Sequence, residues 1–142
     1  MNDATSSSKK HDNATAKRVP QGATQHSTAG PYSPVLEIQA DLLVVISGQV
    51  ALDPQGKIIG DTIEEQTRAT LANCRRQLDS AGCTFDDVFK VNAYMTDLND
   101  WDRFNAVYME MIPEPRPVRT TIGAKLLRNF LIEIEMWAVK RA

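Results

Sequence analysis

The first alternation of apolar and polar residues predicts two short strands. LEIQ at 36–39 and LLVVISGQV at 42–50 are separated by only two residues, Ala40 and Asp41, which is typical of a β-hairpin. The second run is apolar at consecutive positions, so we expect that strand to be buried on both faces. Gly48 within it indicates a β-bulge or a close approach of another group to the backbone.

A helical period begins at Thr62. Small and apolar residues recur every three or four positions, as an amphipathic helix requires: Ile63, Thr67, Thr70, Leu71, Cys74, Leu78 and Ala81. Thr62 and Glu65 have the spacing of a capping box, and Gly82 stands where a helix ends.

The second half of the chain repeats this change of period. FDDVFKVNAY at 85–94 alternates like a strand, and a helix follows Asp97, with Asn105 on its flank and an apolar stripe of Trp101, Phe104, Tyr108 and Met111. Three prolines between 113 and 117 end this helix and lead into two final strands.

The predicted element order is therefore β-β-α-β-α-β-β, an α+β domain whose two helices cover one face of a sheet. In the last strand one set of alternating residues suits the helices: Phe130, Ile132, Ile134, Met136 and Ala138. The other set mixes apolar with acidic side chains: Leu131, Glu133, Glu135, Trp137 and Val139. That mixture suits neither solvent nor a core, and it predicts a subunit interface.

Arg119 and Glu133 are charged residues within the two apolar strands at the end of the chain, and their presence there needs an explanation. If Val118 and Ile122 face the helices, Arg119 lies with Glu133 on the uncovered face. A guanidinium there could bind a carboxylate through two parallel hydrogen bonds, and an acid nearby could orient a water. The alternative is an ion pair between Arg119 and Glu133 or Glu135 across neighbouring strands.

Composition narrows the classes of function. The chain has 142 residues and a formal net charge of −2, which predicts a single domain without a nucleic-acid surface. Cys74 and Cys83 are too few for a disulfide framework or a metal cluster, and both histidines lie in the polar N-terminal segment, so we expect no metal.

The ends and the longest apolar runs bear on location. LLVVI at 42–46 is far too short to span a bilayer, so we expect no membrane partner. Residues 1–28 are polar and predict a disordered tail, which leaves 29–142 as the folded domain. This segment resembles neither a secretory signal nor a transit peptide, and we expect a cytoplasmic protein.

Several other polar residues have ordinary structural explanations. Tyr32 is explained by packing, Asn105 by helix capping or solvation, and Gly48 by a bulge. Ser47 lacks the partners of a nucleophile, since the folded part has no histidine and no GxSxG motif, and this excludes a serine hydrolase.

Six segments taken together carry a resemblance to a known family. They are GPYSP at 30–34, VISGQV at 45–50, EEQTRATLANC at 64–74, AGCTFDDVFKVNAYMTDLNDWDRFNAVY at 81–108, PVRTTIGA at 117–124 and LIEIEMWAV at 131–139. In this unbroken order, from about Gly30 to the C-terminus, they resemble the Rid family of reactive-intermediate deaminases, formerly called YjgF. The resemblance implies a chorismate-mutase-like fold and a homotrimer with its three sites between subunits. It also implies cofactor-independent hydrolysis of enamines and imines, such as 2-aminoacrylate, to 2-keto acids and ammonia.

The resemblance also assigns roles to individual residues. Arg119 matches the arginine that binds the substrate carboxylate, and Glu133 matches the glutamate that orients water. The family's other substrate contacts match Tyr32, Ser47, Gly48 and Asn105. Thr121 takes a place often held by cysteine, and the turn LLRNF is one residue shorter than in many members, which changes the expected register of Glu133 against Arg119.

Three other functions stay open beside hydrolysis of 2-aminoacrylate. The substrate of the same reaction could be a dedicated catabolic enamine. A ribonuclease is a second reading, which the acidic net charge disfavours. The third is a ligand-binding or chaperone-like trimer without turnover, and the presence of Arg119 favours the enzyme over it.

Overall fold

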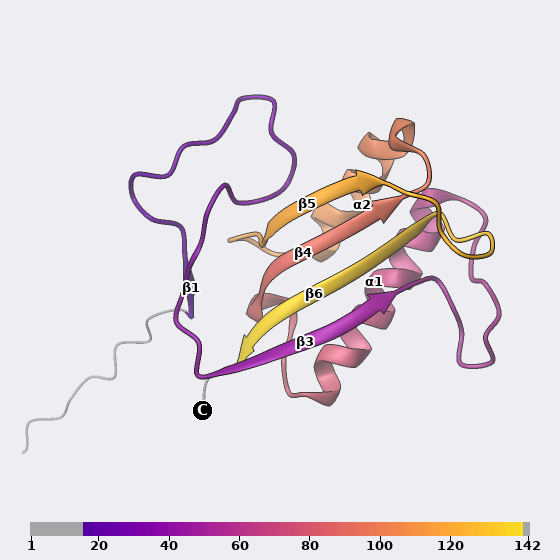
Figure 1. The fold of residues 1–142 in the computed structure, drawn as a ribbon, viewed down its shortest axis with the longest axis horizontal. Coiled ribbons are helices and arrows are strands. Elements are labelled where there is room, and N and C mark those ends of the chain that lie inside the picture. The colour runs from indigo at the N-terminus through magenta and orange to yellow at the C-terminus, as the bar shows by residue number, and fades with distance from the viewer. Residues whose placement is uncertain (1–15, 141–142) are drawn as a thin grey trace, which may run out of the picture.

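Two helices cover one face of a four-stranded sheet in the computed structural model, which describes residues 16–140 (Figure 1). The strands lie in the order β3 (Leu42–Gln49), β6 (Ile132–Lys140), β4 (Val88–Met95) and β5 (Val118–Gly123). Strands β4 and β5 are parallel, whereas β6 is antiparallel to both β3 and β4. The predicted α+β class, with α1 (Ile63–Ser80) and α2 (Trp101–Met111) on one face, is confirmed.

The predicted hairpin at 36–50 is wrong. Strand β2 (Glu37–Ile38) pairs with β1 (Lys17–Arg18), whereas β3 pairs with β6 from the other end of the chain. Two residues between apolar runs satisfied the hairpin pattern, but the long β6 offers β3 a full ladder that the two-residue β2 cannot offer.

The structure also differs from the predicted tail over residues 16–28. Lys17 is buried there, and its ammonium group donates a hydrogen bond to the Val88 carbonyl at 2.6 Å. Arg18 forms an ion pair with Glu37 on the partner strand. Residues 1–15 of the predicted tail lie outside the described residues. The polar composition of this segment predicted disorder, but the side chain that is buried in β1, Lys17, is itself polar.

We expect Lys17 to make stability depend on pH. Burial lowers the pKa of Lys17 from about 10.5 to about 8, against the opposing effect of Asp86 and Asp87. Above pH 8 the unfolded chain binds one proton more than the folded protein, so the free energy of unfolding rises with pH until about 10.5. Chemical unfolding of the wild type and Lys17→Met between pH 7 and about 9.5 measures this effect. The free energy of unfolding of the wild type minus that of the variant should increase with pH.

The difference between the two proteins isolates Lys17 from cysteine and tyrosine ionisation, which affects both equally. Lys57→Met is the matched control, because Lys57 is exposed. A wild-type advantage over Lys17→Met that stays constant across this range would contradict the assignment.

Helix α1 begins and ends as predicted. The Thr62 hydroxyl accepts a hydrogen bond from the Glu65 amide at 3.2 Å, and the Glu65 carboxylate accepts one from the Thr62 amide, so the capping box is present. Gly82 follows the helix with φ of 73°. The buried stripe of Ile63, Thr67, Thr70, Leu71, Cys74 and Leu78 is confirmed.

The second half of the chain also follows the prediction, with differences at the starts of its elements. Phe85–Asp87 forms a short 3-10 helix, so β4 begins only at Val88. Leu98–Asp100 forms another, which the Asp97 side chain caps before α2 begins. In β6 the alternating set that includes Ile132, Ile134 and Met136 is buried against the helices, as predicted.

Strand β3 is not buried on both faces in this single chain, which corrects the prediction. Ile46 is buried, but Leu43 and Val45 are 55% and 59% exposed. Leu43 and Val45 alternate with Ile46 and belong to the face that the helices leave uncovered. A continuous apolar run predicts burial, but within residues 16–140 the chain places helices over the other face of the sheet only.

Candidate functional site

Arg119 points toward the helices, which corrects the predicted orientation of β5. Arg119 stands opposite Val91 in the β4–β5 register, and Val91 stands opposite the buried Met136 in β6. Ile122 stands opposite Tyr94, which stands opposite Glu133, so these residues share the uncovered face. Hydrophobicity had assigned Val118 and Ile122 to the core, but the uncovered face takes apolar residues as well.

Aromatic rings surround the Arg119 guanidinium. Its central carbon lies 4.7 Å from the ring centre of Tyr108 and 5.2 Å from the ring centres of Phe104 and Trp101, all on α2. The ring of Tyr32, from the segment before β2, lies 5.4 Å away. These faces stabilise a cation without neutralising it. The sequence reading had assigned the α2 aromatics to the core alone, although their shared stripe could have indicated a cage.

The Arg119 guanidinium has no hydrogen-bond partner among residues 16–140. The residue is only 8% exposed, and all three of its guanidinium nitrogens are buried without one. The alternative of an ion pair with Glu133 or Glu135 is therefore wrong, and β4 separates the two strands concerned. Burial lowers the pKa of Arg119, yet arginine keeps its charge in proteins. A buried, unpaired cation is costly, and a bound anion would relieve that cost.

Gly30 packs directly against this cation and its cage. A β-carbon built on Gly30 would lie 3.0 Å from Cε1 of Tyr32, 3.3 Å from Cζ2 of Trp101 and 3.4 Å from Nη2 of Arg119. Glycine therefore lets the backbone approach two rings of the cage and the guanidinium more closely than a larger residue could. The sequence reading placed Gly30 only in a turn.

Two further site residues with unpartnered polar atoms lie at this edge of the sheet. Thr121 shares the helix-facing side of β5 with Arg119, and its buried hydroxyl has no partner. Asn105 is 8% exposed, and its buried side-chain oxygen also has none. Asn105, Trp101 and Gly30 line a pocket of about 530 Å³. The structure thus brings together Tyr32, Asn105, Arg119 and Thr121, as a group that we call the arginine half-site.

Ser47, Gly48 and Glu133 form a second group, the glutamate half-site. The β3–β6 register shifts between Ile46 and Gln49, which confirms the bulge at Gly48. A β-carbon on Gly48 would lie 3.0 Å from the carboxyl carbon of Glu133, which confirms the close approach too. Because β3 and β5 are opposite edges of the sheet, and Glu133 and Arg119 lie on opposite faces, one chain does not bring the two half-sites together.

The second acid of the last strand already has partners. Glu135 accepts hydrogen bonds from the Tyr94 hydroxyl and from the Asn92 amide, the latter at 3.2 Å. The bond to Glu135 holds the Tyr94 proton and raises the pKa of that phenol. Glu135 is therefore tied within the uncovered face, which distinguishes it from Glu133 beside the bulge.

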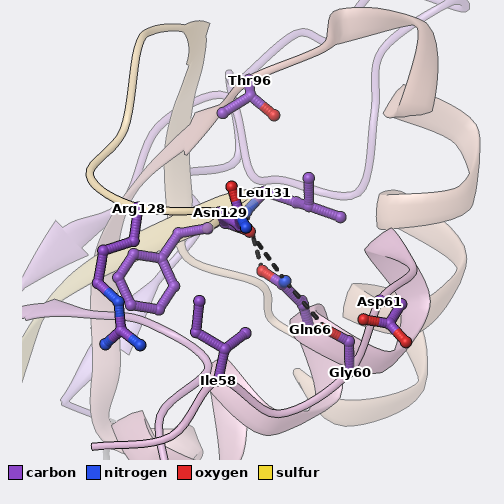
Figure 2. A pocket seen from close by; sticks show the side chains of 9 residues that line it. Ile58, Gly60, Asp61, Gln66, Thr96, Arg128, Asn129 and Leu131 are labelled. Carbon is purple, nitrogen blue, oxygen red and sulfur yellow. Dashed lines mark hydrogen bonds between the residues drawn. The ribbon is translucent and has the colours of Figure 1, made fainter.

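Another pocket, of about 490 Å³, lies between the start of α1 and the turn before β6 (Figure 2). Its buried polar group is Gln66, whose amide nitrogen donates to the carbonyls of Gly60 and Asn129 and whose oxygen accepts from the Leu131 amide. These bonds satisfy the side chain and hold the turn. We therefore place the candidate site at Arg119, where buried groups lack partners.

Two properties of residues 16–140 concern metal ions and membranes. No group of three or more His, Cys, Asp or Glu side chains there could hold a metal ion. Neither described helix combines the length and the hydropathy that crossing a bilayer requires.

Comparisons with known proteins agree with the fold. The family model Endoribonuclease L-PSP matches residues 23–140. A RutC family protein of Pyrococcus horikoshii is 40% identical over 113 residues, which are 78% of this chain and 88% of that protein. The mouse (Mus musculus) 2-iminobutanoate/2-iminopropanoate deaminase is 35% identical over 113 residues, or 78% of this chain and 82% of the mouse protein.

Solved structures extend this similarity to three dimensions. The structure of Escherichia coli TdcF with bound serine superposes with a TM-score of 0.66 at 29% identity, and the match covers 84% of this chain and 98% of that one. Sequence and structure thus agree over most of the chain. The protein therefore belongs to the Rid family, formerly YjgF, which the matching model describes as Endoribonuclease L-PSP.

Proposed function

We propose that this protein is a cofactor-independent deaminase that hydrolyses 2-imino and 2-enamino acids of the 2-aminoacrylate type to 2-keto acids and ammonia. The observation that carries the proposal is the Arg119 guanidinium, buried in an aromatic cage with no hydrogen-bond partner among residues 16–140 and packed beside Gly30, which has no side chain. The substrate carboxylate is the partner that this cation lacks. The activity in the name of the mouse relative supports the same reaction.

In this mechanism Arg119 holds the carboxylate and thereby positions the adjacent C=N carbon. An enamine first takes a proton at its terminal carbon, gives up one proton from nitrogen, and so becomes the imine. Water then adds to the imine carbon, and the resulting carbinolamine transfers a proton to nitrogen, expels ammonia and forms the ketone. Imines hydrolyse in water unaided, so positioning and modest electrostatic help are sufficient catalysis.

Glu133 orients the attacking water, and we propose that it comes from a neighbouring subunit. A homotrimer that places the β3 edge of one chain beside the β5 edge of the next would join the glutamate half-site to the arginine half-site. The exposed Leu43, Val45 and Ile122 on the uncovered face support burial of this face against other copies. Each trimer would then hold three sites between subunits.

The test is hydrolysis by the wild-type protein. A PLP-dependent dehydratase generates 2-aminoacrylate in the cuvette, and a dehydrogenase that consumes the keto acid reports its release. The protein should increase the rate of keto acid formation above that in buffer, in proportion to its concentration. Equal rates with and without the folded protein would reject the deaminase proposal for this substrate class.

We expect Gly30→Ala to weaken ligand binding. The new methyl group would lie 3.4 Å from Nη2 of Arg119 and only 3.0 Å from Cε1 of Tyr32, so it would displace the ring and obstruct access to the guanidinium. A loss of about tenfold in affinity for 2-ketobutyrate, about 1.4 kcal/mol, is expected by calorimetry. Gly22→Ala is the matched control, because a β-carbon there meets nothing within 4 Å. Equal affinities for the two variants would show that the carboxylate does not enter beside Gly30.

The other readings give different results in the same assays. A dedicated catabolic enamine as substrate would leave 2-aminoacrylate turnover low but still dependent on Arg119. A binding module would bind 2-ketobutyrate without hydrolysing imines. The ribonuclease reading has the family description in its favour, and it predicts RNA cleavage that survives loss of Arg119. We also propose that the protein is cytoplasmic, as the sequence led us to expect.

A further inference from the structure

A second guanidinium lies on the pocket that adjoins the arginine half-site. Arg116 lines the pocket of about 530 Å³ together with Gly30, Trp101 and Asn105. Its side chain is 19% exposed, and its Nε is buried with no hydrogen-bond partner. Its Nη1 forms an ion pair with Glu114 at 2.8 Å. Glu114 is 77% exposed, so this pair is of the weak surface kind.

The pocket adjoins the cage of the first cation. Gly30 and Trp101 line the pocket, and both also pack against Arg119: the Trp101 ring centre lies 5.2 Å from the central guanidinium carbon, and a β-carbon on Gly30 would lie 3.4 Å from Nη2. A ligand whose carboxylate reached Arg119 past Gly30 would extend its side chain past Asn105 toward Arg116. A volume of about 530 Å³ accommodates a side chain much larger than the methyl group of 2-iminopropanoate.

We propose that Arg116 is a specificity residue that selects 2-imino acids with a second carboxylate in the side chain. This inference rests on the proposed function and adds the substrate class. Arg119 binds the carboxylate next to the imine, and Arg116 donates hydrogen bonds to the carboxylate at the far end. The exposed Asp102 on the pocket rim and Glu114 oppose an anion, but solvent screens both more than it screens a half-buried guanidinium.

The experiment compares substrates of one and two carboxylates. An amino acid oxidase generates the imines of glutamate and of 2-aminobutyrate in the cuvette, and the released keto acids are followed with and without the protein. We expect the wild type to favour the dicarboxylic imine in kcat/KM. In Arg116→Met the ratio of dicarboxylic to monocarboxylic kcat/KM should fall about tenfold, the expected effect of one charge-assisted contact.

Two further variants keep the test independent of folding. Glu114→Gln releases the competing partner of Arg116, so the ratio should rise. Arg75→Met removes an exposed arginine and should leave the ratio unchanged. Calorimetry with 2-ketoglutarate and 2-ketobutyrate should show the same order of affinities in each variant.

A wild type that prefers the monocarboxylic imine, or a ratio that neither Arg116→Met nor Glu114→Gln changes, would overturn the inference. The deaminase proposal would survive that result if Arg119→Met still abolished turnover of both imines. Turnover that did not depend on Arg119 would instead reject the proposed function itself.

Discussion

Arg119→Met should lose imine hydrolysis by about a hundred- to ten-thousandfold while the protein stays folded. Two charge-assisted hydrogen bonds to the substrate carboxylate disappear, at about 1.5–3 kcal/mol each. Methionine has a similar volume, is flexible and packs well against aromatic rings, so it can fill most of the cage of Tyr32, Trp101, Phe104 and Tyr108. The measurement is kcat/KM with enzymatically generated 2-aminoacrylate, together with the affinity for 2-ketobutyrate.

The same substitution should not destabilise the protein. The wild-type guanidinium is buried with three unpartnered nitrogens, and replacing it with an apolar side chain removes a desolvation cost. We therefore expect the melting temperature of Arg119→Met to equal or exceed that of the wild type, with a free energy of unfolding up to about 2 kcal/mol higher. A residue that served stability alone would give the opposite result.

Arg119→Lys separates charge from geometry. Lysine keeps the positive charge but cannot offer two parallel N–H groups to one carboxylate, so we expect activity between those of the wild type and Arg119→Met. An Arg119→Met protein that turns over imines at the wild-type rate, or that unfolds at room temperature, would contradict the assignment of Arg119 as the carboxylate-binding residue.

The correct parts of the fold prediction depend on local signals. The capping box at Thr62 and the glycine at position 82 act within a few residues, so their pattern in the sequence is sufficient to place α1. The alternation in β6 is equally local, because one of its faces packs on helices that the chain itself supplies. In both elements, propensity and tertiary packing favour the same structure.

The errors involve partners far away in the sequence. The pairing of β3 with β6, and of β2 with β1, joins segments that no local pattern connects. The orientation of Arg119 failed for a related reason. Alternation separates two faces of a strand, but an uncovered face that is itself apolar looks like a core, and Val118 and Ile122 therefore misled the assignment.

Only part of the candidate site could be predicted from the sequence. The resemblance to the Rid family named Arg119, Glu133 and the contact residues. It did not show that the α2 aromatics enclose the cation or that the Gly30 backbone packs against it. Those features need side chains from three separate segments in one place. The separation of the two half-sites likewise needed the strand order β3-β6-β4-β5.

That separation leads to the second large effect, which is complementation between two inactive proteins. Arg119→Met lacks the arginine half-site, and Glu133→Gln lacks the acid of the other half-site. If each site takes Arg119 from one subunit and Glu133 from the next, a trimer of mixed chains contains some sites with both residues intact. Every trimer that contains both kinds of chain, in either ratio, has one of its three sites with both residues intact, so mixed trimers should recover about a third of wild-type activity.

Coexpression of the two variants with different affinity tags, followed by purification on both tags, yields the mixed trimers for this measurement. The two variants purified separately and mixed without subunit exchange are the control and should stay inactive. Light scattering on the same samples should give the mass of three chains. Sites contained within single chains would show no recovery in either sample, because every chain carries one damaged half-site. Recovered activity near a third, about that of one intact site per mixed trimer, would require both half-sites to meet across a subunit boundary, since neither mutant chain can supply both residues alone.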